Sequence, residues 1–442
     1  MGLFSCMSEQ RELLVYALIG LYVINKLVVY FKLRQFGGPR WTGVSDWPHS
    51  WAMLQDRCHK LYEQVNLKHG PIARVAPNIL ITSSPKLWIQ VNSKPGYKRS
   101  DWYYNACRIE HRRDNVFNLT DNQKHEQRRK QMAPGYSGRE NRHLETSIDE
   151  RVQEFVDLIR NKYLSSETQV IPMDLAQKVQ YLTLDVISGI GFGKTFGMVK
   201  NDSDVDDWLA HAPIIGRFIA PSPKDNNGFG KMIAACYRAV DERAANPTDQ
   251  RSDMLASFIR HGISGDDLRS EALEQLIAGA DTTSTGIRGA LLYIMTNPRV
   301  YQKLQREVYD AILEGKNPDS GQGIITLTQT KKLPYLQAVI REALRLWPPA
   351  VNIFSRDTPP GGDTVTVNGE SIFLPGGVSI GYSAYGMHHS QEVYGKDAKV
   401  FRPERWLKSD PDKLAAMIRT NELVFGHGRF QCLGRPVAQL EL

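Results

Sequence analysis

The sequence has few cysteines, and none of them belongs to a short paired motif. Its five cysteines, Cys6, Cys58, Cys107, Cys236 and Cys432, are spread over 442 residues. Their odd number and the absence of any CxxC pair argue against a disulfide framework and against a structural zinc site. We therefore expect the folded part of the chain to lie in the cytosol, with at least one cysteine free for other chemistry.

The sequence also lacks internal repeats, low-complexity tracts and any recognisable nucleic-acid-binding motif. Its composition, 41% hydrophobic and 23% charged residues, is that of an ordinary globular protein. The formal net charge of +7 could suit nucleic acid, an anionic membrane or an acidic protein. Because the basic residues form no tail and no motif, we expect no nucleic-acid partner, which leaves a membrane or an acidic protein.

Long hydrophobic runs are absent, with one exception at the N-terminus. Residues 13–31 form a nineteen-residue apolar stretch that is interrupted only by Asn25 and Lys26, close to the length that spans a bilayer. No small-residue cleavage site follows it, which argues against a removed signal peptide. The alternative, a buried core helix, fits poorly with a position at the start of the chain.

Basic residues after this stretch indicate its orientation. Lys32, Arg34 and Arg40 follow the apolar stretch, so the positive-inside rule places the bulk of the chain in the cytosol. Residues 37–39, Gly-Gly-Pro, read as a hinge. We therefore predict a membrane anchor and hinge over residues 1–36 and a catalytic domain over residues 37–442.

Hydrophobic periodicity predicts a mainly helical fold with small β-sheets. Apolar residues recur at helical spacing over residues 147–162, 173–190, 271–296, 300–314 and 332–346. Residues 71–83 are rich in β-branched side chains and predict a short hairpin. Residues 363–380 predict strands joined by a tight turn at Asn368-Gly369.

Residues 425–434, FGHGRFQCLG, place one cysteine in a glycine-rich loop just before a helix-like segment. Gly426, Gly428 and Gly434 allow a tight turn and the close approach of a flat cofactor. Backbone N–H groups and the dipole of the following helix would favour an anionic sulfur at Cys432. A thiolate so placed suits an iron ligand, whereas the alternative is a buried structural cysteine.

This loop resembles the haem-binding loop of cytochromes P450, and it matches that loop at Phe425, Gly428, Cys432 and Gly434. The resemblance implies the cytochrome P450 fold with a single large haem-binding domain, and haem b held by the Cys432 thiolate. One departure is Phe430, which stands where the family commonly has a basic residue. Arg429 beside it is the residue expected to supply that charge to the cofactor.

A second segment, residues 278–283 (AGADTT), resembles the oxygen-activation segment of the family's long central helix. The resemblance implies that Gly279 leaves room for dioxygen and that Thr282 donates a hydrogen bond during its activation. Asp281 would relay protons through water. Without the cysteine loop, the same residues could merely weaken a surface helix.

Glu342 and Arg345 match the family's ExxR pair, and Arg405 lies in a segment, FRPERW, that resembles the family's meander. The resemblance implies a buried structural triad of these three residues, paired by bidentate hydrogen bonds. A Glu and an Arg three residues apart also occur on many solvent-exposed helices.

His125 and Arg129 lie one helical turn apart and resemble the family helix that holds the haem propionates, with histidine where many members have tryptophan. Arg356 is a further candidate propionate partner. The alternative for each is a solvated basic face. Arg128 and Lys130 could instead face an acidic reductase.

Among cytochromes P450, the segments KRSDWY near Lys98 and PSPKDNNGFGK near Pro221 look most like fungal enzymes of the pisatin demethylase type. The resemblance implies hydroxylation or oxidative demethylation of a lipophilic small molecule in fungal secondary metabolism. Electrons would come from NADPH through NADPH-cytochrome P450 reductase, because the chain has no flavin or nicotinamide motif of its own. The expected location is the endoplasmic reticulum membrane, with the catalytic domain in the cytosol.

The alternative function is a catalytically impaired or truncated P450 paralogue that binds haem weakly. The access-channel region around residues 214–218 looks shorter than in relatives, and the chain ends ten residues after Cys432. Both features keep this alternative open, and the short segment after Cys432 predicts weak haem retention.

Overall fold

The computed structural model describes residues 2–108, 113–208, 222–225, 228–246, 251–313 and 325–442. The expected shortening around residues 214–218 lies outside these ranges. The chain forms two compact units. Unit 1 comprises residues 1–100 and 351–395, and unit 2 comprises residues 101–350 and 396–442.

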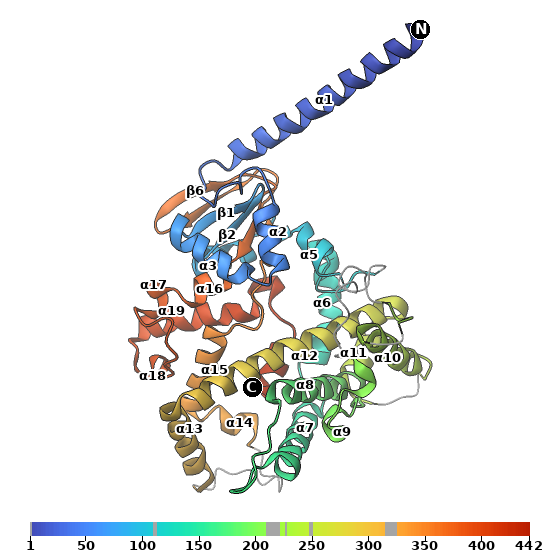
Figure 1. Cartoon of the computed structure of the whole chain (residues 1–442). Helices are drawn as coiled ribbons and strands as arrows, with labels where there is room; N and C mark the ends of the chain where they lie inside the picture. The colour runs from blue at the N-terminus through green and yellow to red at the C-terminus, as the bar shows by residue number, and fades with distance from the viewer. Residues whose placement is uncertain (1, 109–112, 209–221, 226–227, 247–250, 314–324) are drawn as a thin grey trace. The chain divides into compact units, whose positions relative to one another are not determined.

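Unit 1 contains the β-sheet and the N-terminal helix (Figure 1). Its main sheet has the strand order β1-β2-β7-β4-β3, and β5 and β6 form a separate two-stranded sheet. The elements are α1 (Gly2–Lys32), α2 (Trp47–Leu54), α3 (Cys58–His69), β1 (Ile72–Ala76), β2 (Ile79–Thr82), α4 (Pro85–Ser93), β3 (Lys98–Arg99), β4 (Arg356–Asp357), β5 (Asp363–Val367), β6 (Glu370–Leu374), β7 (Ser379–Tyr382), α16 (Ala384–His388) and α17 (Gln391–Tyr394).

Both expected hairpins are present. Strands β1 and β2 pair antiparallel, as do β5 and β6. The turn between β5 and β6 consists of Asn368 and Gly369, whose φ angles of 52° and 85° both lie in the left-handed region. Asn and Gly tolerate this region at low cost, which is why the pair makes a tight hairpin turn.

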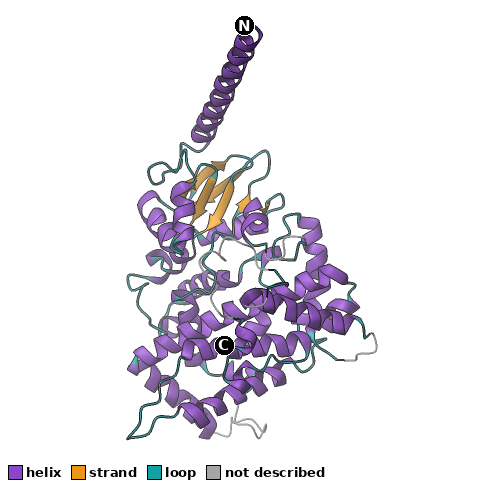
Figure 2. Ribbon diagram, turned by 45° about the vertical axis from the view of Figure 1, so that its right-hand side comes forward, coloured by secondary structure: helices purple, strands orange, loops and turns teal. Residues whose placement is uncertain are grey.

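Unit 2 is helical, as Figure 2 shows. It contains all five helices that periodicity predicts, with their ends shifted by a few residues; α12 begins earlier, at Gly265. Its α-helices are α5 (Asp101–Ala106), α6 (Asn122–Tyr136), α7 (Leu144–Leu158), α8 (Leu175–Phe192), α9 (Met198–Asn201), α10 (Gly228–Ala244), α11 (Met254–Arg260), α12 (Gly265–Thr296), α13 (Pro298–Ala311), α14 (Leu327–Thr330), α15 (Pro334–Leu346), α18 (Arg405–Lys408), α19 (Pro411–Asn421) and α20 (Arg435–Glu441).

Local sequence sets the ends of the helices that matter for the site. Asp121 caps α6, where its carboxylate accepts hydrogen bonds from the backbone N–H groups of Gln123 and Lys124. Helix α8 ends at Gly193, which takes up the left-handed conformation with φ of 69°. Helices α8 and α12 share a large hydrophobic cluster, in which Val179 and Leu276 are buried. This packing holds α12 in place along its length.

The segment after α1 is packed rather than free. Leu33 and Phe36 are buried, and the backbone N–H of Arg74 donates to the carbonyl of Gly37 at 2.8 Å. A hinge was expected at residues 37–39, on the grounds that glycines loosen a chain. Here a Cβ atom at Gly38 would lie 2.2 Å from the Arg74 carbonyl, so the glycine serves close packing instead.

Candidate active site

The loop before α20 turns back on itself around Cys432. The backbone N–H of Cys432 donates to the carbonyl of Phe425 at 2.7 Å, which closes the loop. Gly426 and Gly428 have φ angles of 72° and 61°, which a residue with a side chain adopts only with strain. A Cβ atom at Gly426 would also lie 2.9 Å from the carbonyl of Phe430. Both glycines are therefore required by the turn.

Cys432 as a residue is exposed to solvent, whereas neighbouring protein groups surround its thiol. Burial of the group by its surroundings raises its pKa above the ordinary value, and backbone N–H groups of Gly434 and Arg435 oppose this rise by donating to the sulfur. The positive charges of Arg129 and Arg435 act in the same direction as these donors. An accessible sulfur with N–H donors and two cations near it is well placed to carry negative charge.

The donor set fits haem and not a bare metal ion. Among the residues with described side chains, no three His, Cys, Asp or Glu gather into a metal site. A single thiolate suits a metal whose other ligands come with a macrocycle, as in haem. A Cβ atom at Gly434 would meet only the Cys432 sulfur, at 3.8 Å, so the space beside the sulfur is open on that side.

Helix α6 brings His125 and Arg129 to this loop. The His125 imidazole is buried, and its ring centroid lies 5.2 Å from that of Phe430. Arg129, one turn further along, lies close enough to Cys432 for their charges to interact, and desolvation lowers the pKa of Arg129. The partly buried Arg129 guanidinium makes no ion pair with any residue that the structure describes, and it is the cation best placed to meet an anionic group there.

Helix α12 has an open side at the predicted proton-relay residues. Ala278, Asp281 and Thr282 are exposed, although most neighbouring residues on this helix are buried or partly buried. Gln180 of α8 donates its amide to the Asp281 carboxylate at 2.9 Å. Desolvation raises the pKa of Asp281, against the lowering effects of Gln180 and Arg288. A carboxyl with a raised pKa holds a proton more readily near neutral pH.

Gly279 has a packing role that the sequence did not indicate. A Cβ atom at this position would lie 2.6 Å from Cδ1 of Ile187 on α8. The glycine therefore permits close contact between α8 and α12. Room for dioxygen beside Gly279 stays a prediction. The sequence motif identifies the glycine, but only packing shows which neighbour it accommodates.

Glu342, Arg345 and Arg405 come together as a fully buried cluster. Arg345 donates to both carboxylate oxygens of Glu342, at 2.9 and 2.8 Å, and Arg405 Nε donates to Glu342 Oε1 at 2.8 Å. Trp406 Nε1 adds a fourth hydrogen bond to Glu342 at 2.9 Å. The indole of Trp406 was within the quoted FRPERW segment, although the sequence alone did not assign it to the cluster. Asp397, which accepts from Arg405 at 3.2 Å, extends the cluster toward the surface.

Arg356 lies in unit 1, on β4. Its guanidinium donates to Asn92 at 3.0 Å and to the carbonyls of Phe354 and Ser355, and it lies 5.4 Å from the ring centroid of Trp88. It is buried, so the alternative of a solvated basic face does not apply. A contact of Arg356 with a haem propionate stays a prediction.

The comparisons with known proteins agree with this geometry. The family model of cytochrome P450 matches residues 42–442. The chain is 34% identical to a protein named cytochrome P450 monooxygenase ABA1 from Pyricularia oryzae, over 97% of this chain and 88% of that protein. It is 33% identical to aba1 from Botryotinia fuckeliana, over 86% and 78% of the two chains. It is 29% identical to abl1 from Leptosphaeria maculans, over 93% and 76%.

The chain belongs to the cytochrome P450 family. It is a fungal cytochrome P450 monooxygenase, and its cofactor is haem-thiolate iron. The expected fold class is confirmed, because the family model of cytochrome P450 covers residues 42–442 and the described chain is mainly helical with small sheets.

The two departures of this P450 from the family pattern lie against each other. Histidine at 125 replaces the common tryptophan, phenylalanine at 430 replaces the common basic residue, and the two rings are in contact. Arg429 was expected to supply the missing charge. That role of Arg429 stays a prediction. The cations that act on Cys432 are Arg129 and Arg435, the second of which is also paired with Glu422 at 3.0 Å.

Arg128 of this P450 points inward, which the sequence did not reveal. It donates to Glu271 and to Asp267 on α12, both at 2.7 Å, and its side chain is only 17% exposed. The suggestion that Arg128 faces an acidic reductase is therefore wrong, because its charge is already neutralised inside unit 2. The alternation of buried and exposed positions along α6 could have indicated this, since Arg128 shares a side of the helix with His125.

The sequence also gave no indication of the buried carboxylates near Cys432. Glu271 is fully buried, and burial raises its pKa to about 7. Glu271 accepts hydrogen bonds from the Val116 N–H at 2.9 and 3.0 Å, so it ties the loop before α6 to α12. Desolvation, followed by the charges of Glu271 and Cys432, raises the pKa of the buried Tyr136 hydroxyl. No sequence motif indicates this cluster of Glu271 and Tyr136.

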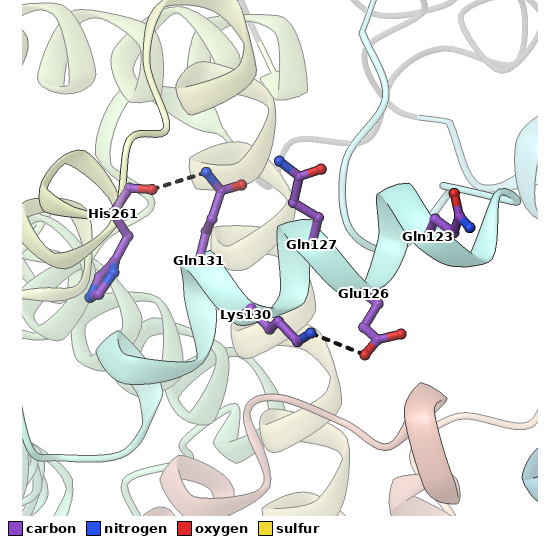
Figure 3. A pocket seen from close by; sticks show the side chains of 6 residues that line it. All are labelled: Gln123, Glu126, Gln127, Lys130, Gln131 and His261. Carbon is purple, nitrogen blue, oxygen red and sulfur yellow. Dashed lines mark hydrogen bonds and ion pairs between the residues drawn. The ribbon is translucent and has the colours of Figure 1, made fainter.

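A hollow of about 460 Å³ lies on the outer surface of α6 (Figure 3). It is lined by Gln123, Glu126, Gln127, Lys130, Gln131 and His261. Some of the side chains that line it pair with one another, such as Lys130 and Glu126, which form an ion pair of 3.2 Å. His125 and Arg129 do not line it, so the hollow is separate from the cysteine loop.

Proposed function

We propose that this P450 hydroxylates or oxidatively demethylates a lipophilic small molecule in fungal secondary metabolism. Haem b is the cofactor, and NADPH supplies electrons through NADPH-cytochrome P450 reductase. The observation that carries the proposal is the accessible Cys432 sulfur, with the N–H groups of Gly434 and Arg435 directed to it. Similarity to fungal P450 monooxygenases supports the reaction class.

Cys432 is the iron ligand in this proposal, and Phe425, Gly428 and Gly434 shape the loop that presents it. Haem-thiolate iron bound there supplies the activation of dioxygen. The ligand in this proposal is the thiolate, whose charge the Gly434 and Arg435 N–H groups stabilise against the burial that raises the pKa of Cys432. Arg129 meets a propionate, supported by His125, while Arg356 and Arg429 remain further candidates for propionate contact.

Proton delivery falls to two residues on α12. The Thr282 hydroxyl, which donates to the Ala278 carbonyl at 2.8 Å, can turn to donate a proton toward the reacting oxygen. Asp281 holds the next proton, since its pKa is raised by desolvation. Glu342, Arg345 and Arg405 have a structural role, because a buried cluster with this many charge-assisted hydrogen bonds fixes the surrounding backbone.

The membrane arrangement belongs to the same proposal. Helix α1 contains a candidate span over Glu12–Lys32, with a mean hydropathy of 1.9 and no burial within the protein. We infer a single span in the endoplasmic reticulum membrane, with residues 37–442 as the cytosolic catalytic domain. Lys130, whose side chain is 75% exposed, is available to an acidic partner such as the reductase.

The decisive experiment replaces the proposed ligand in the full chain. Cys432→Ala is expected to abolish the carbon monoxide difference spectrum of reduced thiolate-ligated haem, measured in membranes. Cys107→Ala, at a partly buried cysteine outside the loop, is the control and should keep the wild-type spectrum. A thiolate-type spectrum that survives in Cys432→Ala would defeat the ligand assignment. A wild-type chain with no such spectrum would favour the impaired paralogue.

A further inference from the structure

The buried side chain of Gln180 joins α8 to three residues of α12, two helices that pack side by side (Figure 1). Its amide nitrogen donates to Oδ1 of Asp281 at 2.9 Å. Its amide oxygen accepts from the Ser284 hydroxyl at 2.8 Å and from Nη2 of Arg288 at 3.0 Å. These three residues of α12 are three and four positions apart, so they lie on one side of the helix.

Arg288 determines which end of the Gln180 amide faces Asp281. A guanidinium carries donors only, so the group that meets it must be the amide oxygen. The amide nitrogen is then left to face the carboxylate. The reverse orientation would set the amide oxygen against the carboxylate and the amide N–H groups against the guanidinium, and both contacts would be repulsive. Arg288 therefore orients Gln180 as a donor to Asp281.

Arg288 is itself held in place by the backbone of α8. Its Nε donates to the Ala176 carbonyl at 2.8 Å, and its Nη2 donates to the same carbonyl. Ala176 lies one helical turn before Gln180, so the two acceptors of the guanidinium share one side of α8. Because Gln180 is 7% exposed, its hydrogen bonds to α12 are largely protected from exchange with water.

The two carboxylate oxygens of Asp281 have different surroundings. Oδ1 accepts the hydrogen bond from Gln180. Oδ2 accepts no hydrogen bond from any residue that the structure describes, and Asp281 is exposed on the open side of α12 together with Thr282. A proton is therefore most readily carried at Oδ2, because Oδ1 is already engaged by a donor.

The surroundings of Asp281 oppose one another in their effect on its proton. Desolvation raises the pKa of this carboxyl, whereas the Gln180 donor and the positive charge of Arg288 lower it. In the described parts of the chain, Arg288 is the charged side chain that acts on Asp281; Asp174, the N-cap of α8, acts on Arg288 in turn. A group that relays protons must both bind and release them, and these opposing effects serve that requirement.

We propose that Gln180 is a positioning residue for proton delivery: oriented by Arg288, it holds Oδ1 of Asp281 and leaves Oδ2 to carry the proton. Asp281 takes one proton from the solvent and releases one toward Thr282, so its charge is the same before and after each transfer. The inference rests on the proposed relay role of Asp281 and deepens it. A link that only packs α8 against α12 would affect stability and leave the carboxyl unchanged.

The first test measures the protonation of Asp281 in the full haem-loaded chain at rest. The infrared band of protonated carboxyl groups is recorded as the pH changes, and Asp281→Asn identifies the part that belongs to Asp281. Gln180→Met keeps the length of the side chain but removes its amide. It should shift the titration of Asp281 upward by about one pH unit, because a donor to the carboxylate is lost.

Thr183→Val is the matched control for this titration. Thr183 is fully buried on α8, one turn after Gln180, and its hydroxyl donates to the Val179 carbonyl of its own helix at 3.2 Å. The variant removes a buried polar group of α8 without a contact to Asp281, so the titration should stay as in wild type. Should Gln180→Met fail to fold, Gln180→Glu keeps the shape of the side chain. Its added negative charge should raise the Asp281 midpoint further.

The second test asks whether Arg288 acts through Gln180. Arg288→Gln should also raise the midpoint, because a positive charge is lost and the Gln180 amide is no longer oriented. If the two residues act as a unit, the double variant of Gln180→Met and Arg288→Gln should shift the midpoint by less than the sum of the two separate shifts. Additive shifts would show that Arg288 does not orient Gln180.

A third measurement separates the positioning role from the proposed function. The peroxide formed per NADPH consumed is followed with NADPH-cytochrome P450 reductase in aerated buffer, without added substrate. Asp281→Asn should raise this ratio, and an unchanged ratio would overturn the relay role of Asp281 itself. A Gln180→Met variant that is less stable, but whose Asp281 titration equals that of wild type, would overturn the positioning role alone and assign Gln180 to helix packing.

Discussion

Thr282 and Thr285 make the same hydrogen bond on α12, because each hydroxyl donates at 2.8 Å to the carbonyl four residues before it. The two side chains therefore have similar local surroundings within the helix. Only Thr282 is proposed to act in oxygen activation, so the pair provides an internal comparison between a proposed catalytic role and a merely structural one.

Thr282→Ala is expected to keep haem binding but to divert reducing equivalents to hydrogen peroxide. The physical reason is the loss of the hydroxyl that is proposed to donate a proton during oxygen activation. The measurement is the amount of peroxide formed per NADPH consumed. Thr285→Ala removes an equivalent helix hydrogen bond and should leave this ratio unchanged. Equal ratios in the two variants would show that Thr282 has no special role.

Gly279→Ala is expected to destabilise the fold by about 1–3 kcal/mol through overpacking against Ile187. The gain in helix propensity, about 1 kcal/mol, offsets part of this cost. Thermal unfolding of the haem-loaded protein measures the effect. In an Ile187→Ala background the new methyl group has room, so the same substitution should cost nothing. An equal loss in both backgrounds would contradict the contact.

Glu342→Gln should destabilise the protein by about 3–5 kcal/mol, because two buried guanidinium groups lose their carboxylate. The control is Glu126→Gln, which breaks an exposed ion pair with Lys130 and should change stability by less than about 1 kcal/mol. Haem content after mild heating provides a second measurement. If Glu342→Gln lowers the stability of the protein no more than Glu126→Gln does, the cluster does not support the surrounding backbone.

Glu271 should make stability fall as the pH rises toward neutrality. Its pKa in the folded protein, about 7, is above the ordinary 4.5, so between these values the folded state binds a proton that the unfolded state has released. The free energy of unfolding therefore decreases as the pH rises from 4.5 to about 7, by about 3 kcal/mol in total, and this contribution is constant above that.

Glu271→Gln should flatten this dependence, since an amide does not ionise. The measurement is the unfolding midpoint at about pH 5 and about pH 7.5. Asp267→Asn changes the other carboxylate partner of Arg128 and should keep the wild-type decrease. A Glu271→Gln variant with an undiminished decrease would assign the titration to another group.

Features that depend on neighbouring residues could be predicted from the sequence. The tight turn at Asn368 and Gly369 follows from the preference of these two residues for positive φ. The long central helix follows from apolar spacing, and the Cys432 loop from its glycines and the helix after it. Each of these signals is local, because turn geometry and helical periodicity act over a few residues.

Contacts between residues distant in the sequence could not be predicted in this way. Phe430 lies against His125, Arg128 turns inward to Glu271, and Gln35 meets Phe373 from 338 positions away. Nothing in the spacing of these residues indicates their partners, because each contact depends on how helices and hairpins pack. The same holds for Gly38 and Arg74. A glycine reads as flexible in the sequence, but here its missing side chain is the space that a neighbouring backbone fills.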